Sequence, residues 1–299
     1  MRKYVLLLVL VLSYLAIISS FTSHMKNRPF LERMGYTPEP LVLKFFSADQ
    51  YRLSAAFLIV KVISYYGSLV EQYQNKIYIP PEYPEMGKTI ETAVKLDPYN
   101  MDSYYFAQAI MIWGASQVKS TNELLEYGMQ YRTWDFYLAY FAGFNYAFFL
   151  KDYANAAKYY KRVGELTGAD LPMNLAGRYM YESGRTDLAV AYLSSMVKSS
   201  TNDAVKKSLQ TRLDAFQGVG KIEQACTSFL NDRHRRPRSV EELVQKGYLE
   251  KVPVDPYGGT YYLDKQGKVR STSKFAYGVA SAARERTSPF NTNDSRLSH

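Results

Sequence analysis

The sequence predicts a mainly α-helical fold in which pairs of helices repeat along the chain. Two segments carry the same pattern, YFAGFNYAFFLKDYANAAKYY at 140–160 and MNLAGRYMYESGRTDLAVAYL at 173–193. In both, Ala-Gly opens a helical run, a short polar break follows, and a second run has alanine at a matching place. The copies lie 33 to 34 residues apart, a period that is typical of helical-repeat solenoids. Such arrays bury a continuous core by stacking helix pairs and present a curved surface.

The composition suits an ordered protein that contains one large domain or two smaller ones. The chain has 299 residues, of which 47% are hydrophobic, and 28 tyrosines and 15 phenylalanines can fill gaps between helices. The formal net charge of +9 favours acidic partners or anionic lipid. Cys226 is the single cysteine, so an intramolecular disulfide is excluded. We expect its thiol to be buried within a helix, because no activating partner lies near it in the sequence.

The N-terminus predicts a signal anchor over residues 1–23. A basic lead, Met1-Arg2-Lys3, precedes an uncharged apolar run at 4–18, whose length lies between that of a secretory signal core and that of a membrane span. The residues after Ile18 suit signal cleavage poorly, so an uncleaved anchor is favoured over a cleaved signal. This predicts a single-pass protein of the inner (cytoplasmic) membrane with its soluble part on the periplasmic side. Basic residues on both sides of the run leave the orientation open.

A connector is predicted at 24–46, because three prolines discourage a helix there. Ser47 and Gln50 then form a capping-box pattern, which predicts a helix from residue 48 to about residue 78. The centre of that helix, 53–70, has the composition of a membrane span. Arg52 and Lys61 lie beside or within it, and charges near the centre of a span are costly. We therefore interpret it as a buried helix of the soluble body.

The segment AVKLDPYN at 93–100 resembles the end of a tetratricopeptide repeat unit, where a helix stops and the next unit begins. On that resemblance, units begin near residues 67, 101, 137 and 170, with a further unit near 204, within a solenoid domain at 47–238. The unit from 101 lacks the expected alanine in its second helix, and the last unit would have Gly218 and Gly220 at its turn. The small residues that match helix-packing positions of the family are Gly143, Ala156, Gly177, Gly184 and Ala189.

The resemblance to tetratricopeptide repeats implies a protein that binds other proteins through a concave inner face lined by the first helices. The candidate partner contacts are Tyr104, Tyr105, Tyr146, Tyr179 and Tyr181. The expected function is a membrane-anchored scaffold that organises an envelope complex around an unidentified protein partner. The aromatic run at 134–149 is interpreted as mostly the core of a central helix.

A separate C-terminal segment is predicted at 239–275, followed by a largely disordered tail at 276–299. Ser239 and Glu242 form a capping box and Gly247 a helix stop, and two short strands at 260–264 and 268–271 flank a turn at 265–267. The stretch DPYGGTY at 255–261 resembles the C-terminal part of type II secretion major pseudopilins. The N-terminus lacks the processing site of such proteins. The resemblance therefore implies, as an alternative function, an accessory component of a secretion or pilus assembly machine.

Signals for an enzyme are nearly absent, and an enzyme of unknown type is the third alternative. His24, His234 and His299 are far apart, and the sequence contains no phosphate-binding loop and no nucleophile elbow. We expect no catalytic residue, no cofactor and no metal site. Asp255 and Asp264 could contribute to a calcium site, but two carboxylates are too few to predict one.

A basic cluster at 233–238 has two interpretations. It could contact anionic lipid headgroups or an acidic partner, or it could be a solvated helix end, where cations suit the helix dipole. The second interpretation is favoured. Nucleic acid is not expected as a partner, because the predicted periplasmic location would remove it. The arginines concerned are Arg233, Arg235, Arg236 and Arg238.

Overall fold

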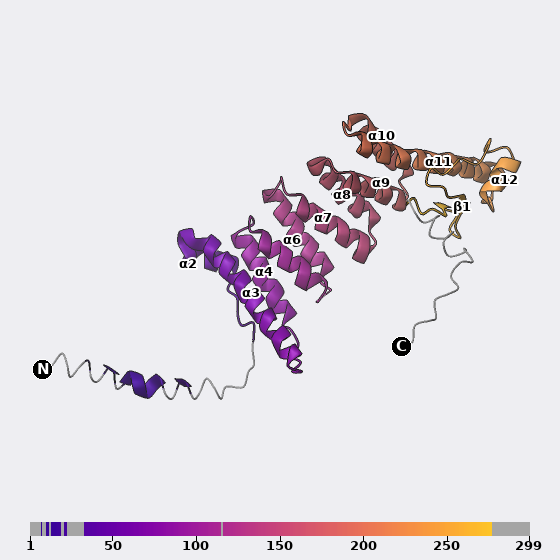
Figure 1. Ribbon diagram of the computed structural model, residues 1–299. Helices are drawn as coiled ribbons and strands as arrows, with labels where there is room; N and C mark the ends of the chain where they lie inside the picture. The colour runs from indigo at the N-terminus through magenta and orange to yellow at the C-terminus, as the bar shows by residue number, and fades with distance from the viewer. Residues whose placement is uncertain are drawn as a thin grey trace, which may run out of the picture. The chain divides into compact units, whose positions relative to one another are not determined.

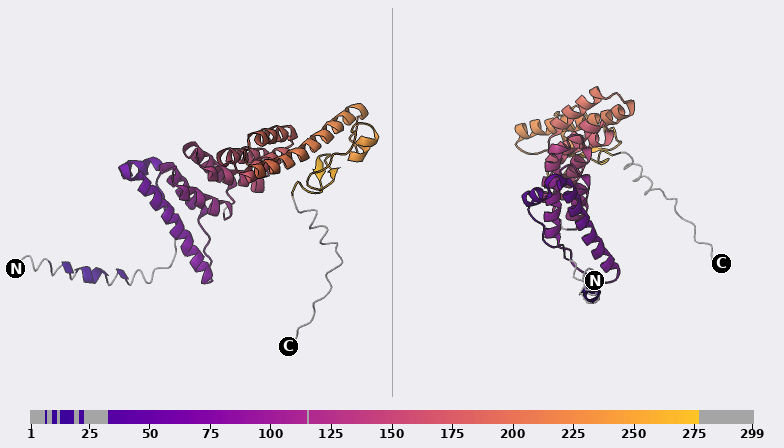
Figure 2. Two further views of the ribbon diagram at one scale, coloured as in Figure 1. Left: turned by 45° about the horizontal axis from the view of Figure 1, so that its top comes forward. Right: turned by 90° about the vertical axis from the view of Figure 1, so that its left-hand side faces the viewer.

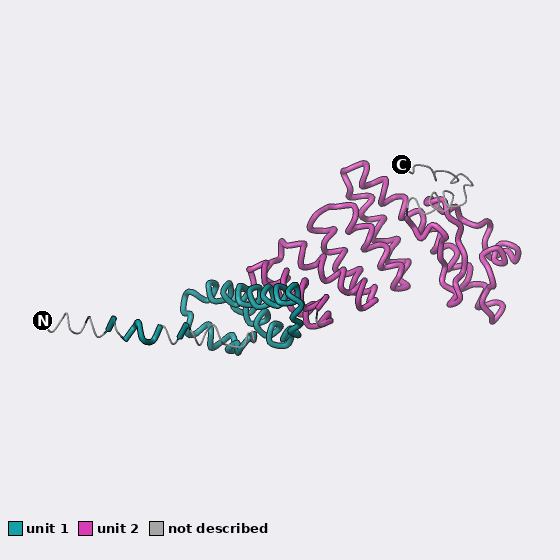
Figure 3. Tube along the Cα trace, turned by 60° about the horizontal axis from the view of Figure 1, so that its bottom comes forward, with its two compact units in different colours: residues 1–97 teal, residues 98–299 magenta. Residues whose placement is uncertain are grey.

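The fold is mainly α-helical, with helices packed pairwise and one small antiparallel hairpin near the C-terminus (Figure 1). The computed structural model describes residues 7, 10–11, 13–18, 21–22, 33–114 and 116–276. The predicted anchor at 1–23 lies largely outside these residues, and the predicted tail at 276–299 lies outside them except for Ala276. The chain divides into two compact units, Met1–Asp97 and Pro98–His299 (Figure 3).

The first unit contains the helices α2 (Pro40–Ser47), α3 (Tyr51–Gln74) and α4 (Tyr83–Leu96), with a short 3-10 turn, η1 (Ala48–Gln50), after α2. The prediction of a non-helical connector up to residue 46 is therefore wrong at its end. Pro40 lies in the first turn of α2, where its missing amide hydrogen costs no hydrogen bond. The predicted cap is also wrong, because the hydroxyl of Ser47 bonds the hydroxyl of Ser54 at 2.6 Å, and Ala48 breaks the helix with a φ of 46°.

Helix α3 packs one face against α4. Its buried residues recur every three or four positions, which places them on one stripe of the helix: Ala55, Ile59, Val62, Tyr65 and Leu69. The backbone amide of Glu82 donates to the hydroxyl of Tyr65 at 3.0 Å and fixes the entry into α4. Helix α4 starts at Tyr83, because Pro84 fits its first turn. The predicted burial of α3 holds for this face only.

The second unit continues with α5 (Met101–Phe106), α6 (Val118–Tyr131), α7 (Phe136–Asn145), α8 (Tyr153–Thr167), α9 (Asp170–Glu182), α10 (Thr186–Ser199) and α11 (Asp203–Arg233). Two π-helical turns, η2 (Ala107–Ile112) and η3 (Tyr146–Leu150), extend α5 and α7. Each helix from α6 to α11 packs against its neighbours in the sequence (Figure 2). The starts of α5, α7, α9 and α11 follow one another at intervals of 35, 34 and 33 residues, close to the predicted unit starts at 101, 137, 170 and 204.

Side-chain caps explain where several of these helices begin. Asn100 accepts from the amide of Asp102, Asp135 from the amide of Tyr137, and Asn202 from the amides of Ala204 and Val205. Asp152 caps α8 in the same way. Asn and Asp are favoured at these positions because their oxygens satisfy amides that lack a partner in the first turn.

Small residues allow close approach where helices of the second unit meet. A Cβ atom built at Gly177 would lie 3.0 Å from the Leu193 side chain, and one at Gly143 would lie 3.1 Å from the Tyr160 ring. Ala156 and Ala189 are fully buried. Gly184 has a different role, because it lies in the turn between α9 and α10 with a φ of 83°.

Gly128 supplies the small residue in the unit from 101, where the sequence lacks the expected alanine. A Cβ atom at Gly128 would lie 2.6 Å from the Tyr104 ring. The Tyr104 ring therefore occupies the space above a helix that has no side chain at this point. The sequence does not indicate this role of Gly128. The small residue is a glycine that faces a tyrosine of the first helix, and the repeat pattern expects an alanine in the second helix.

The prediction of a fifth helix pair with a turn at Gly218 and Gly220 is wrong, because α11 continues through both residues for 31 residues. Neither glycine has a positive φ. A Cβ atom at Gly218 would lie 2.8 Å from the hydroxyl of Tyr261, whereas one at Gly220 would meet no atom within 4 Å. Gly218 therefore serves a close contact, and the chain does not turn there.

The predicted C-terminal helix and hairpin are confirmed as α12 (Val240–Gln245), β1 (Tyr261–Leu263) and β2 (Val269–Ser271). Ser239 caps α12 through the amide of Glu242, and Gly267 closes the hairpin with a φ of 79°. Tyr261 pairs with Ser271 across the antiparallel strands. Four apolar residues of the segment share one core with α9, α10 and α11: Tyr257, Tyr261, Val269 and Phe275.

Candidate functional site

A groove runs along α11 in the second unit. One part, with a volume of about 880 Å³, is lined by α10 and α11, and a smaller part of about 310 Å³ lies between α11 and the hairpin. Glu223 and Thr227 line both parts, so the two lie next to each other on α11. We call the two parts together the α11 groove. Its other lining residues include Val190, Gln217, Lys221, Gln224 and Ser228 in the larger part and Cys226, Leu230, Arg236 and Lys268 in the smaller part.

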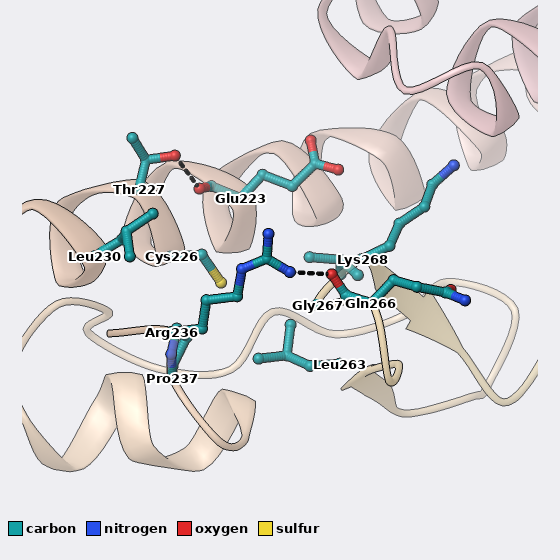
Figure 4. A pocket seen from close by; sticks show the side chains of 11 residues that line it. Glu223, Cys226, Thr227, Leu230, Arg236, Pro237, Leu263, Gln266, Gly267 and Lys268 are labelled. Atoms are coloured by element: carbon teal, nitrogen blue, oxygen red, sulfur yellow. Dashed lines mark hydrogen bonds between the residues drawn. The ribbon is translucent and has the colours of Figure 1, made fainter. Parts of the chain in front are cut away.

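The smaller part of the groove is shown from close by in Figure 4. Cys226 and Leu230 project from α11, and Arg236 reaches across to donate to the backbone oxygen of Gln266 in the hairpin turn. The turn residue Gly267 leaves room for this contact, because a Cβ atom there would lie 3.2 Å from the Arg236 guanidinium. The arginine thus ties the loop after α11 to the hairpin at one end of the groove.

The hairpin is fixed to the end of α9 by two basic residues. Lys268 donates to the backbone oxygens of Tyr181 and Glu182 at 3.0 and 2.8 Å, which are among the carbonyls that a helix end leaves without partners. Burial lowers the pKa of the Lys268 ammonium group. Arg270 bonds Glu182 at 2.7 Å and Asp264 at 3.2 Å. These bonds hold one wall of the α11 groove in place.

Burial shifts the pKa values of two ionisable groups that line the groove. Burial raises the pKa of the Cys226 thiol to about 11, and the nearby Glu223 carboxylate adds to the effect. The thiolate is the reactive form, so the thiol is a weak nucleophile at neutral pH. Burial also raises the pKa of Glu223, which accepts a hydrogen bond from Thr186 at 3.2 Å. Within the described part of the chain, no three His, Cys, Asp or Glu side chains are grouped to hold a metal ion.

The two aspartates that flank the hairpin are engaged with the hairpin itself. Asp255 is buried and accepts from the amide of Tyr257 and from the hydroxyls of Ser271 and Ser273. Asp264 accepts from two amides of the turn and from Arg270. Asp264 therefore acts as a turn former within the hairpin, whereas Asp255 both forms its own turn and ties it to the end of β2.

Two of the five predicted partner contacts are wrong, because the side chains of Tyr104 and Tyr181 are fully buried. The hydroxyl of Tyr104 donates to the backbone oxygen of Pro98 at 2.8 Å. The hydroxyl of Tyr181 donates to the backbone oxygen of Val269, and its ring stacks on Phe216 at 5.0 Å. Both tyrosines fill the core and are closed to a partner.

The other three predicted contacts differ in exposure. Tyr146 is half-buried, stacks on Tyr159 at 5.5 Å and donates to Glu126. Tyr179 is half-buried as well, between neighbouring tyrosine rings. Tyr105 is the one member of this set that is well exposed, at 57%. None of the five lines the α11 groove.

The arginine cluster at 233–238 fastens the C-terminal segment to α11. Arg235 bonds Glu242 of α12 at 2.6 Å and lies over the Phe229 ring, and the amide of Arg238 donates to the same carboxylate. These contacts lower the pKa of Glu242 to about 2. Arg233 reaches the hydroxyl of Tyr248 at 3.4 Å. The contacts support the interpretation of the cluster as a helix end, while contact with anionic groups stays a prediction.

The aromatic run at 134–149 is only partly core. Trp134 and Phe148 are 62% and 51% exposed, and Phe148, within η3, packs with Phe149 of the same turn and with Trp113, which directly follows η2. The prediction of a central, mostly buried helix is wrong at these positions. The sequence predicted neither the aromatic cluster of Trp113, Phe148 and Phe149 nor the α11 groove. The residues of each lie on separate helices, and no sequence pattern shows which helix faces converge.

One run of the described residues, Pro40–Gln74, is long and apolar enough to cross a membrane by length and composition. Its most apolar window has a mean hydropathy of 1.7 and is 28% buried. The described part of the chain therefore has one candidate membrane helix near its N-terminus. No family model, no curated protein and no solved structure matches the chain.

Proposed function

We propose that the protein is a membrane-anchored scaffold whose second unit, a tetratricopeptide-like solenoid, binds a segment of another protein in the α11 groove. The observation that carries the proposal is the groove itself, which lies at the end of a series of pairwise-packed helices. Helix starts that recur every 33 to 35 residues support the solenoid, and arrays of this kind present long surfaces to partners.

The lining of the groove favours a peptide segment as the ligand. Gln217, Gln224 and Ser228 offer amide and hydroxyl groups that can hydrogen-bond an extended backbone. Val190 at one end and Leu230 at the other supply apolar contacts for side chains of the partner. The volume of each part, about 880 Å³ and about 310 Å³, falls in the range of ordinary binding sites.

Anchorage to the inner membrane is supported by the sequence of the N-terminus and by the apolar helix that follows it. The uncharged run at 4–18 follows a basic lead, and Pro40–Gln74 adds a second apolar segment. We place the remainder of the protein on the periplasmic side. Protease digestion of spheroplasts tests this placement, because a periplasmic second unit is degraded and a cytoplasmic one is protected.

The scaffold is favoured over an accessory pseudopilin-like role, because the hairpin buries its aromatic residues in the core of the helical array. Tyr261 and Phe275 share that core with Phe216 of α11. The hairpin thus acts as a cap of the array. The raised pKa of Cys226 supports binding over covalent catalysis.

The proposal is tested by site-specific photo-crosslinking in cells. A benzophenone amino acid at Gln224, which is exposed in the groove, should yield a discrete protein adduct, whereas the same probe at Lys206 should not. Lys206 is exposed on the same helix but does not line the groove. Gln217→Arg, which fills the groove with a charged side chain, should abolish the adduct. Equal adducts from both positions, or no adduct from Gln224, would refute the assignment of the groove.

A further inference from the structure

Helix α2 and the outer face of α3 present an apolar surface to solvent. On α2, Leu41, Phe45 and Phe46 are each 80% exposed or more. On α3, Leu53, Phe57 and Val60 are each more than half exposed. Soluble surfaces carry single apolar residues, but six such residues on two helices in contact mark an interaction site. We call these six residues the α2–α3 patch.

The patch lies opposite the face of α3 that packs on α4. Leu53, Phe57 and Val60 follow one another at spacings of four and three residues, which places them on one stripe. The stripe of Ala55, Ile59 and Val62 is buried on the other side of the same helix. Helix α3 therefore has two apolar faces, of which one is covered within its own unit.

A transmembrane orientation of α3 conflicts with the packing of α4. Helix α4 contacts α3 along its length and carries exposed or half-exposed charges at Glu85, Lys88, Glu91 and Lys95. If α3 crossed the bilayer as packed here, α4 would bring these charges into the hydrocarbon, which is costly. An orientation along the membrane surface leaves α4 in water and buries only the α2–α3 patch.

We propose that the α2–α3 patch inserts into one leaflet of a phospholipid bilayer, at the boundary between headgroups and acyl chains, with α2 and α3 lying along the membrane surface. The inference rests on the membrane anchorage proposed above and adds a second, peripheral contact. The chain limits the distance, because 21 residues lie between Ile18 and Pro40, and even a fully extended connection of that length spans at most roughly 75 Å. The first unit is thus held near the bilayer that receives the apolar run.

Charge and side-chain type also fit a lipid surface. Residues 40–61 contain three basic residues, Lys44, Arg52 and Lys61, and one acidic residue, Asp49. Lys44 and Arg52 both lie over the ring of Tyr51, at 5.8 and 5.9 Å from its centroid. Basic and tyrosine side chains are favoured at the boundary between headgroups and acyl chains, and helices with one apolar and one polar side bind there. Anionic lipid complements the excess of positive charge.

The test uses the full chain reconstituted in vesicles of phosphatidylcholine and phosphatidylglycerol. In a Cys226→Ser background, single cysteines replace Phe46, Phe57 or Tyr78, and each carries an environment-sensitive NBD fluorophore. Tyr78 is the matched control, because it is 73% exposed in the same unit but lies outside the patch. Far-UV circular dichroism verifies that each labelled chain is folded.

We expect a blue-shifted emission and quenching by nitroxide-labelled lipid for the probes at Phe46 and Phe57, and quenching by aqueous iodide for the probe at Tyr78. Iodide quenching at Phe46 and Phe57 would show that the patch faces water and would overturn the inference. Protection of these probes from both quenchers would overturn it as well, because a protein surface would then cover the patch. Flotation of the vesicles distinguishes failure of this inference from failure of the proposed anchorage. If the chain floats with the vesicles but its probes are exposed to water, the anchorage stands and insertion of the patch is refuted. If the chain does not float, both are refuted.

Discussion

Replacing Gly218 by alanine should loosen the hairpin from α11, whereas the same change at Gly220 should stabilise the protein. The two glycines lie two residues apart within one continuous helix. A methyl group at Gly218 would lie 2.8 Å from the hydroxyl and 3.2 Å from the ring of Tyr261, and 3.3 Å from Pro253. A methyl group at Gly220 would meet no atom within 4 Å. The pair therefore separates the effect of the contact from the effect of helix propensity.

The magnitude follows from two opposing effects. Alanine in place of glycine within a helix contributes about 0.5 to 1 kcal/mol, and this is the whole expected gain at Gly220. At Gly218 the added methyl overpacks a closed contact, which costs about 1 to 3 kcal/mol. It also displaces the Tyr261 hydroxyl, which donates to the backbone oxygen of Ala215 at 2.9 Å. We expect a net loss of roughly 1 to 2 kcal/mol for Gly218→Ala after the propensity gain is subtracted.

Urea unfolding followed by circular dichroism measures both changes, and hydrogen exchange of the segment at 253–275 shows whether the hairpin is the part that loosens. A double mutant with Tyr261→Phe adds a further control. The phenylalanine removes the oxygen nearest to the new methyl group, so the cost of Gly218→Ala should be smaller in that background. The reasoning is refuted if both glycine variants destabilise the protein equally, as they would at a turn, or if both stabilise it.

Three further outcomes are expected. Gly177→Leu should lower the unfolding temperature, because its Cβ alone would lie 3.0 Å from Leu193 and overpacking costs about 1 to 3 kcal/mol; an unchanged thermal melt would contradict this. Cys226 should react with iodoacetamide at pH 8 roughly 100-fold more slowly than an ordinary cysteine, because its pKa is raised to about 11, and urea should restore the rate. In the folded protein, Arg235 and the amide of Arg238 lower the pKa of Glu242 to about 2. The stabilisation from Glu242 is therefore fully present above its pKa in the unfolded chain, about 4.3, and is lost as the pH falls through 2. An NMR titration should show the pKa of Glu242 rising in Arg235→Gln, and an unchanged value would exclude the ion pair as its cause.

The starts of α5, α7, α9 and α11 could be predicted closely from the sequence because the signals that set them are local. Asp152 caps α8 through an amide three residues away, and Ser239 caps α12 in the same manner. The period of the helix pairs follows from such repeated local signals. The hairpin is equally local, because Gly267 and the alternating residues beside it define its turn.

The roles of individual glycines and tyrosines could not be predicted, because they depend on contacts between distant residues. Gly218 looks like a turn residue in the sequence, yet its role is set by Tyr261, which lies 43 residues later. Tyr104 and Tyr105 are neighbours with opposite roles, one fully buried and one exposed. The difference arises because Gly128 leaves space for the Tyr104 ring, and no pattern near residue 104 signals it.

The α11 groove follows from how the helical array ends. The last helix of a stacked array has no further helix pair to cover its apolar face. Here Tyr261, Val269 and Phe275 of the C-terminal segment cover Phe216 and its neighbours, and Lys268 and Arg270 fix the hairpin to the end of α9. Beside this covered face, Gln217, Lys221 and Gln224 of α11 line the larger part of the groove together with α10, and the hairpin bounds the smaller part. Binding along the whole groove therefore depends on the position of the hairpin against α11. Gly218→Ala should weaken the crosslink at Gln224, although Gly218 does not line the groove.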